Sequence, residues 1–323
     1  MKVGILGTGA YGMALSSILV HNCEVTMWTK FEDEKNNLIQ TKKNETLLPG
    51  FILGDGVVVT TDLEECIRDK DLLIIALPTP FVNELCINMK PYVKDHRILI
   101  ASKGIEQGSG LFIHEMIESN LDTDKISIIS GPSFAQDLIQ NMPQGLTIAS
   151  HDEESLQIIE KAFASENIQF MKTDDVVGVE LCGSVKNIMA IGSGILNGMD
   201  VTESTKAMFL VEAMSTMKEI LAILGCRRET MDSYAGVGDL VLTSTSEKSR
   251  NYSFGYDIGK GMTKEEKDHY VQEKTVEGYH TLESIKKLLA KKEKTVPLLE
   301  VLYQICFEMV PANTLLKYLA NNK

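Results

Sequence analysis

A glycine-rich loop stands near the beginning of the chain, directly after a short apolar run. The sequence GTGAYG occupies residues 7–12 and follows Lys2–Leu6. In such a motif Gly7 makes a tight turn, Gly9 lets the backbone approach a pyrophosphate, and Gly12 lets a helix pack against the strand. The first turn of the helix then offers free N–H groups and a partial positive charge to phosphates. The motif predicts a dinucleotide-binding site.

A lysine lies inside an apolar stretch in the second half of the chain. Lys186 belongs to the sequence GSVKN at 183–187 and is flanked by Cys182 and by Ile188–Ile191. Buried lysines are rare unless they are paired or functional. Because desolvation favours the neutral amine, such a lysine is suited to proton transfer near neutral pH. We expect Lys186 to be a proton donor, and the alternative is an amine that reaches the surface.

Two polar groups further along could orient and hold an anionic substrate. The glycines of AGVG at 235–238 imply a tight backbone beside Asp239, whose carboxylate can orient a lysine or accept from a substrate hydroxyl. Arg250 and Asn251 together would form an anion clamp, since guanidinium matches phosphate oxygens bidentately. The alternative is a loop between helices with a solvated arginine.

Two further motifs each follow a candidate strand. Ser102-Lys103-Gly104 follows Ile98–Ala101, and SGPSFA at 130–135 follows Ile126–Ile129. The carboxyl ends of parallel strands meet at the rim where the glycine loop also lies. A lysine there could reach a phosphate or a polarised carbonyl oxygen, and Gly-Pro-Ser presents backbone N–H groups and a hydroxyl. The alternative for both is an ordinary turn, with a solvated lysine in the first.

These motifs require a scaffold, and the sequence changes character near residue 175. Before it, β-branched runs alternate with amphipathic stretches, which predicts parallel strands with crossover helices. The candidate strands are Lys2–Leu6, Glu24–Trp28, Val57–Thr60, Leu72–Leu77, Ile98–Ala101, Ile126–Ser130 and Gly145–Ala149. After it, the predicted helices are Val176–Asn197, Thr205–Leu224, Thr281–Leu289 and Pro297–Val310. We therefore predict an α/β protein with a doubly wound parallel sheet over residues 1–175 and an all-helical domain over 176–323.

Composition narrows the class of protein. The net charge of −13 argues against nucleic acid or an anionic membrane as a partner. The six cysteines form no CxxC pair, which favours reduced thiols in the cytoplasm and gives no sign of a metal site. No apolar run approaches the roughly 18–20 residues of a membrane-spanning helix, so we expect no membrane span.

Taken together and in this order, GxGxYG, SKG, SGPSFA, GSVKN, AGxGDL, SRN and VEGY resemble the bacterial NAD(P)-dependent glycerol-3-phosphate dehydrogenases. The resemblance covers residue 3 to about residue 280. It implies a Rossmann-type N-terminal domain for the cofactor and a helical C-terminal domain for a small phosphorylated substrate. It further implies interconversion of dihydroxyacetone phosphate and sn-glycerol 3-phosphate for glycerophospholipid synthesis, and we expect a homodimer.

The resemblance also assigns roles to individual residues. It makes Lys186 the catalytic acid or base, with Lys103 and Asp239 around it. It places the substrate at Lys103, Gly131, Ser133, Lys186, Asp239, Ser249, Arg250 and Asn251. It places the cofactor at Gly7, Gly9, Ala10, Tyr11, Gly12, Lys30, Lys103, Ala135, Arg250, Thr275 and Glu277. Nothing in the local sequence around Thr275 and Glu277 points to that role.

The chain departs from the family pattern in the second predicted C-terminal helix. Glu212 stands where members usually carry an arginine, and Ser204 stands near a position that is often asparagine. The departure predicts a variant substrate or a different subunit contact. It keeps open a related dehydrogenase acting on another phosphorylated or sugar-linked alcohol. A non-catalytic nucleotide sensor is the other alternative, and the presence of Lys186 and Asp239 speaks against it.

The cofactor is expected to be NADPH or NADH, with NADPH favoured. An NAD-selective site usually has Asp or Glu about 20 residues beyond the glycine loop, where it bonds the ribose 2′-hydroxyl. Here the second strand is followed by Thr29-Lys30, and a lysine would attract a 2′-phosphate. Glu32 and Asp33 come slightly later and are the competing candidates for the ribose.

Overall fold

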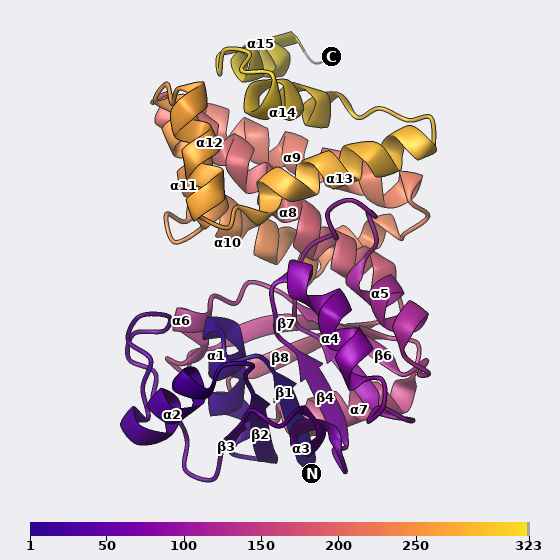
Figure 1. Cartoon of the computed structure of the whole chain (residues 1–323). Coiled ribbons are helices and arrows are strands. Elements are labelled where there is room, and N and C mark those ends of the chain that lie inside the picture. Colours follow the sequence, from indigo (N-terminus) through magenta and orange to yellow (C-terminus); the bar gives the residue numbers. More distant parts are fainter. Residues whose placement is uncertain (322–323) are drawn as a thin grey trace. The chain divides into compact units, whose positions relative to one another are not determined.

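The computed structural model of the chain describes residues 1–321 and divides into two compact units (Figure 1). The first unit consists of Met1–Lys103 and Phe112–Val176. The second consists of Gly104–Leu111 and the chain from Val177 onward. A short segment from the first half of the sequence, residues 104–111, therefore groups with the helices of the second half.

The first unit is built on an eight-stranded sheet with the order β3-β2-β1-β4-β5-β6-β7-β8. The chain adds strands outward from β1 to β3 on one side of the sheet and from β4 to β8 on the other. The switch between the two sides lies between β1 and β4, which is the place where doubly wound sheets bind ligands. The fold class predicted from the sequence is confirmed. The strands are β1 Lys2–Leu6, β2 Glu24–Trp28, β3 Val58–Thr60, β4 Leu72–Ile75, β5 Arg97–Ile100, β6 Ile126–Ser130, β7 Gln144–Ser150 and β8 Ile168–Thr173.

The last strands of the sheet differ from the sequence prediction in two respects. Strand β7 runs antiparallel to β6, with Ser127 opposite Ser150, whereas we predicted parallel strands. The connection between them contains only the four-residue helix α6, Ala135–Leu138, in place of a full crossover helix. Strand β8 was missed altogether, because it is an edge strand whose side chains alternate between half-buried and exposed.

Helices cover both faces of this sheet, and strand β1 explains how. Val3 and Ile5 point to one face, where they join the apolar core that contains Met13 of α1. Gly4 points to the other face, where a Cβ atom would lie 2.1 Å from the carbonyl oxygen of Cys66 in α3. The helices of the first unit, besides α6, are α1 Ala10–Leu19, α2 Glu32–Thr41, α3 Leu63–Ile67, α4 Val82–Met89, α5 Ile113–Asn120 and α7 Glu153–Ala162, with a 3₁₀ turn at Thr79–Phe81.

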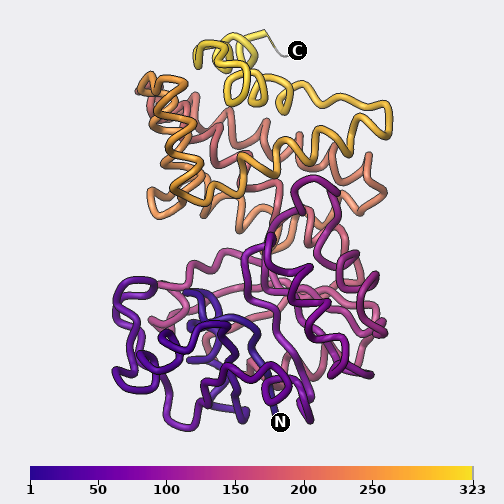
Figure 2. The backbone as a smooth tube through the Cα atoms, in the orientation of Figure 1, coloured from indigo at the N-terminus to yellow at the C-terminus, as the bar shows by residue number. Residues whose placement is uncertain are grey.

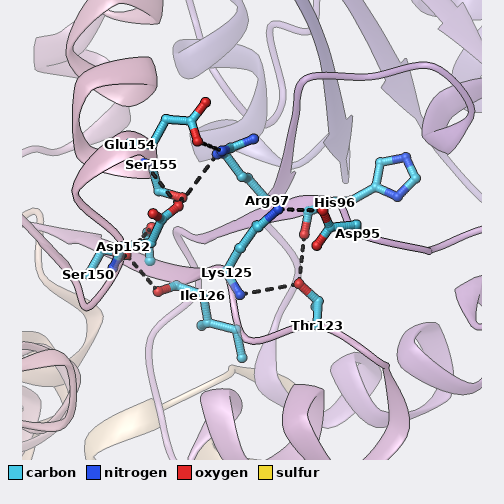
Figure 3. Close-up of polar contacts among 11 residues, drawn as sticks. Asp95, His96, Arg97, Thr123, Lys125, Ile126, Ser150, Asp152, Glu154 and Ser155 are labelled. Carbon is cyan, nitrogen blue, oxygen red and sulfur yellow. Dashed lines mark hydrogen bonds and ion pairs between the residues drawn. The ribbon is translucent and has the colours of Figure 1, made fainter.

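A group of charged side chains joins the amino ends of β5 and β6 to the start of α7 (Figure 3). Arg97 at the start of β5 lies 2.5 Å from Glu154 and 3.5 Å from Asp152, which caps α7. Lys125, just before β6, lies 2.5 Å from Asp95. Because parallel strands share one direction, this cluster lies at the amino ends of the strands, and the glycine loop lies at their carboxyl ends. We assign it a structural role.

The second unit consists of helical coils joined by loops (Figure 2). Its α-helices are α8 Val176–Gly198, α9 Glu203–Ile223, α10 Asp239–Thr245, α11 Arg250–Gly259, α12 Lys264–Glu273, α13 Glu277–Lys291, α14 Pro297–Phe307 and α15 Thr314–Asn321. A 3₁₀ turn at Arg228–Asp232 and a π-helical turn at Tyr234–Gly238 precede α10.

Helix α8 corrects one expectation from the sequence. Within the described residues it is the one helix long and apolar enough to cross a membrane, although we expected no run of that length. However, 94% of its most apolar window is buried inside the protein. A helix packed on all sides is apolar all round, as a membrane helix is. Burial in the core of the second unit accounts for its composition.

The cysteines are buried or half-buried thiols, and the structure pairs none of the six in a disulfide within residues 1–321. Burial raises the pKa of Cys66, Cys86 and Cys306 to about 12. These thiols are therefore protonated and unreactive at neutral pH.

Candidate active site

A cavity of about 600 Å³ lies in the first unit at the point where the strand order reverses. The glycine loop, the carboxyl ends of β2 and β4, and helix α4 form its walls. The lining residues are Gly7, Thr8, Gly9, Trp28, Thr29, Lys30, Phe31, Glu34, Leu63, Leu77, Pro78, Phe81, Glu84, Leu85, Asn88 and Tyr92. Phe31 and Phe81 are more than half exposed, so two aromatic rings are available to a planar ligand.

The glycine loop fits a pyrophosphate. Gly7 has φ of 128°, and a Cβ atom there would lie 2.6 Å from the carbonyl oxygen of Ala76. At Gly12 a Cβ atom would lie 2.3 Å from the carbonyl oxygen of Gly7, so helix α1 packs directly on the turn. At Gly9, by contrast, no described atom lies within 4 Å of that position. Gly9 is also the N-cap of α1. Because glycine has no side chain to cap the helix, backbone N–H groups of the first turn are left for phosphate oxygens.

Lys30 lines this cavity at the end of β2, where the sequence predicted a ribose contact. Its ammonium lies 2.9 Å from a carboxylate oxygen of Glu84 on α4. Of the competing candidates, Glu32 pairs with Lys35 and accepts from Thr61, and these contacts, the first above all, hold its pKa below the usual range. Neither Glu32 nor Asp33 is among the lining residues. Glu34, which was not predicted to face the cofactor, lines the cavity and accepts a hydrogen bond from Thr29.

The other predicted residues of the first unit lie in α1 and after β5 and β6. Ser133 is buried, and its hydroxyl lies 2.9 Å from the hydroxyl of Tyr11 on α1. The carbonyl of Gly131 accepts from the same hydroxyl of Ser133 at 3.2 Å. Ala10 and Ala135 are the first residues of α1 and α6, two helices that pack against each other. Tyr11 therefore links the glycine-loop helix to the SGPSFA loop.

The backbone of Lys103 is fixed by a neighbouring turn. Its carbonyl oxygen accepts from the hydroxyl of Thr79 at 2.9 Å. The next residue, Gly104, donates its N–H to the hydroxyl of Ser184 on α8 at 3.2 Å. The single peptide group between Lys103 and Gly104 is thus hydrogen-bonded at both its oxygen and its nitrogen.

In the second unit, Lys186 and Asp239 form a buried ion pair. The ammonium nitrogen of Lys186 lies 2.6 Å from Oδ1 of Asp239, and their side chains are 7% and 2% exposed. Lys186 also donates to the hydroxyl of Thr243 at 2.8 Å, and that hydroxyl donates to Oδ1 of Asp239 at 3.2 Å. This burial excludes a surface-seeking lysine. The apolar flanks did not reveal that Lys186 has an anionic partner, which favours its ammonium form.

Local backbone structure fixes Asp239. It is the first residue of α10 and follows the π-helical turn at Tyr234–Gly238. Within that turn, a Cβ atom at Gly236 would lie 2.2 Å from the carbonyl oxygen of Met231, so the predicted tight backbone is present. A carboxylate in the first turn of a helix is stabilised by the helix dipole. Thr243 is one turn later on the same face of α10, which explains why both reach Lys186.

Helix α11 crosses α8 with backbone against backbone. Cβ atoms added at Gly194 and Gly198 of α8 would lie 2.0 and 2.2 Å from carbonyl oxygens of α11. Cβ atoms added at Gly255 and Gly259 of α11 would lie 2.0 and 2.2 Å from carbonyl oxygens of α8. The two helices each contribute a GxxxG pair, and no side chain separates them. The crossing fixes the N-terminus of α11 relative to the helix that carries Lys186.

Around that N-terminus, the predicted phosphate residues meet the start of α13. Asn187 donates to Glu277 at 3.1 Å, and Arg250 lies 3.9 Å from the other oxygen of that carboxylate. The side-chain oxygen of Asn251 accepts the N–H of Gly278 at 2.8 Å. Arg250 is 60% exposed, so its guanidinium is accessible.

Two of the predicted residues, Ser249 and Thr275, lie at the starts of helices. Ser249 caps α11 by accepting the N–H of Tyr252, and Thr275 is exposed just before α13. Thr243 and Asn187 were not predicted, although Thr243 lies at i+4 from Asp239, a spacing that could have identified it. Within residues 1–321 no group of three metal-binding side chains gathers.

Comparison with protein families matches both halves of the chain. Residues 2–156 match the NAD-dependent glycerol-3-phosphate dehydrogenase N-terminus, and residues 175–317 match the C-terminus of the same family. The chain belongs to the NAD-dependent glycerol-3-phosphate dehydrogenase family. The family, the oxidoreductase activity on a CH–OH group and the use of NAD(P) predicted from the sequence are confirmed.

Individual members of the family are similar over nearly their whole length. The glycerol-3-phosphate dehydrogenase [NAD(P)+] of Staphylococcus carnosus is 33% identical over 323 residues, covering 98% of this chain and 97% of the relative. That of Agathobacter rectalis is 31% identical and covers 96% and 93%. The crystal structure of glycerol-3-phosphate dehydrogenase from Coxiella burnetii has a TM-score of 0.91, with 28% identity and coverage of 99% and 98%.

The departure from the family pattern at Glu212 has a visible partner in this dehydrogenase. The hydroxyl of Tyr318 on α15 donates to Glu212 at 2.6 Å. Burial raises the pKa of Tyr318 the most, and the hydrogen bond to Glu212 and the negative charge of Glu212 raise it further. Glu212 thus ties α9 to the last helix of the chain.

We predict that Gly255→Ala disturbs the active site of this dehydrogenase without altering any polar group in it. The new methyl group would overlap the Ile191 carbonyl, so α8 and α11 must move apart. We expect a loss of roughly 1–3 kcal/mol in stability, the usual scale for overpacking, and a lower kcat/KM for the phosphorylated substrate. Thermal unfolding and steady-state kinetics measure both. Ser253→Ala, on the half-exposed side of α11, is the matched control, and equal behaviour of the two variants would contradict the packing argument.

Proposed function

We propose that this chain reduces dihydroxyacetone phosphate to sn-glycerol 3-phosphate, reversibly, with NADPH or NADH, and so supplies glycerophospholipid synthesis. The observation that carries the proposal is the buried Lys186–Asp239–Thr243 group in a member of this family. A buried ammonium held by a carboxylate suits a reaction that must place a proton on a carbonyl oxygen.

Lys186 is the proton donor in this proposal. A nicotinamide held in the cofactor site would supply the hydride for the keto carbon. Negative charge develops on the carbonyl oxygen during reduction, and Lys186 stabilises it and transfers a proton to it. Asp239 keeps Lys186 in the ammonium form before transfer, and Thr243 holds both groups in place. In the reverse direction, Lys186 accepts the proton of the substrate hydroxyl.

The phosphate end of the substrate is assigned to other residues. Lys103 adds positive charge near the reacting carbonyl, while Gly131 and Ser133 offer backbone and hydroxyl groups. Ser249, Arg250 and Asn251 hold the phosphate at the start of α11, where the helix dipole also favours an anion. These contacts orient the ketone and do no covalent chemistry.

The cavity of the first unit is the proposed cofactor site. Gly9 and Ala10 would offer backbone N–H groups to the pyrophosphate at the start of α1. Gly7, whose N–H is donated to the Trp28 carbonyl at 3.0 Å, and Gly12 shape the turn that brings this backbone close. Lys30 faces the ribose and makes NADPH at least as good a cofactor as NADH. The further residues assigned to the cofactor are Tyr11, Lys103, Ala135, Arg250, Thr275 and Glu277. We place the enzyme in the cytoplasm, a compartment in which cysteines stay reduced.

A homodimer is the proposed assembly, with α9 in the contact. Met208 and Val211 on α9 are 49% and 67% exposed, next to Glu212. Exposed apolar side chains gathered on one helix face favour a protein contact. The hydrogen bond from Tyr318 to Glu212 orders the neighbouring α15.

For Lys186→Met we expect kcat to fall at least ~10²-fold, the scale of a positioned acid–base group, while cofactor affinity is unchanged. Turnover is measured as NADPH oxidation with dihydroxyacetone phosphate, and cofactor affinity by titration. Asp239 would be left buried without its cation, so stability must be measured alongside.

The matched control is Lys267→Met, at another buried lysine of the second unit. Lys267 is 4% exposed on its side chain and donates to the Cys306 carbonyl at 3.1 Å. Its loss should lower stability but retain most of kcat. If Lys186→Met kept a third of the wild-type kcat, the assignment of the proton donor would be wrong.

The phosphate assignment predicts that plain dihydroxyacetone is a very poor substrate. Arg250→Ala should lower kcat/KM for dihydroxyacetone phosphate at least about 30-fold, roughly 2 kcal/mol, the low end for truncating one partner of a charge pair. Arg228→Ala, an exposed arginine in the same unit, is the control and should have little effect. Equal kcat/KM for the two ketones in the wild type would rule out phosphate recognition.

The assembly proposal is tested at Glu212. Glu212→Arg should change the oligomeric mass, measured by light scattering, and leave kcat/KM nearly unchanged. Tyr318→Phe separates the loss of the intrachain hydrogen bond from the change of charge, and Glu219→Arg, exposed on the same helix, is the control. A changed preference among phosphorylated ketones at constant mass would show that Glu212 instead reads the substrate.

A further inference from the structure

Negatively charged side chains outnumber positively charged ones in the lining of the first unit's cavity. Among the residues that the structure describes, its lining holds one cation, Lys30, and two carboxylates, Glu34 and Glu84. Glu34 accepts from the hydroxyl of Thr29, and Glu84 lies 2.9 Å from the Lys30 ammonium. The cation expected to attract a 2′-phosphate therefore already has an anionic partner.

The position of this pair relates it to the ribose. Lys30 comes two residues after Trp28, the last residue of β2, and dinucleotide sites of this fold read the adenosine ribose at that point. Glu84 reaches the same point from the first turn of α4. The two side chains are 62% and 58% exposed, so neither is locked in the pair by burial. Exposed ion pairs contribute little free energy and can exchange partners.

We propose that Glu84 is a selectivity residue of the cofactor site, which weakens binding of the 2′-phosphorylated dinucleotide relative to the form with a free 2′-hydroxyl. The inference rests on the proposed function only in taking this cavity as the cofactor site. A 2′-phosphate carries close to two negative charges at neutral pH, so it must compete with Glu84 for Lys30 and then remain beside the displaced carboxylate. A 2′-hydroxyl is neutral and pays neither cost, and a carboxylate can accept its hydrogen bond.

The expected size of the effect follows from the exposure of the pair. At a separation of several ångströms in a water-like dielectric, removing one negative charge beside a doubly charged phosphate should change affinity by about 3- to 10-fold. Salt screens such an effect. The selectivity contributed by Glu84 should therefore shrink as ionic strength rises.

The test is binding of NADPH and NADH to the intact protein without substrate, followed by cofactor fluorescence or calorimetry. Glu84→Gln should tighten NADPH about 3- to 10-fold and change NADH by less than about twofold. Asp33→Asn is the matched control, because Asp33 is exposed in the first turn of α2, just after β2, but does not line the cavity. Lys30→Asp should weaken NADPH far more than NADH.

Each outcome decides the matter. If Glu84→Gln changes both cofactors equally, or Asp33→Asn has the same effect, the proposal is wrong. A lower melting temperature with weaker binding of both cofactors would mean that Glu84 only stabilises α4, and would also overturn it. Binding is measured without turnover, so a chain that shifts its cofactor ratio as expected yet fails to reduce dihydroxyacetone phosphate would refute the proposed function and retain this inference.

Discussion

Helices α8 and α11 lie so close together that their carbonyl oxygens occupy the space of missing side chains. Four glycines make this possible, and substitution at any of them would bring a methyl group to within 2.0–2.2 Å of backbone. The arrangement of the second unit depends on this contact. Helix α8 carries Lys186 and Asn187, and α11 begins with Arg250 and Asn251. The spacing between the proposed proton donor and the proposed phosphate-binding groups is thus determined by backbone packing, which tolerates little variation.

The ion pair between Lys186 and Asp239 is the costly element within that framework. Removing two charges from water is unfavourable unless each finds good partners. Here Thr243 completes a closed group of three, and the helix start at Asp239 adds a favourable dipole. The surrounding helix is apolar because it is buried almost throughout. An ammonium in such surroundings interacts strongly with any charge that develops beside it, which is the condition for efficient proton transfer.

Much of the fold could be predicted from local sequence, because parallel strands with both faces covered are continuously apolar. Strand β8 escaped, since Gln169 and Lys172 on an edge strand break that pattern. The reversed direction of β7 depends on a short connection and not on the strand's own residues. In the site, the burial of Lys186 could be predicted from its neighbours. The pair of Lys30 with Glu84 could not, because the two residues are 54 positions apart and meet only once the sheet has formed.

The segment 104–111 means that the two units are not two consecutive pieces of the gene. The chain passes from one unit to the other after Lys103, after Leu111 and again after Val176. A polypeptide cut near residue 176 would keep this segment but lose Ser184, the acceptor for the Gly104 N–H. A chimera with a single junction near residue 176 would therefore combine segment 104–111 of one protein with the second unit of another. Exchanging one unit for that of a relative therefore requires junctions at three places in the chain.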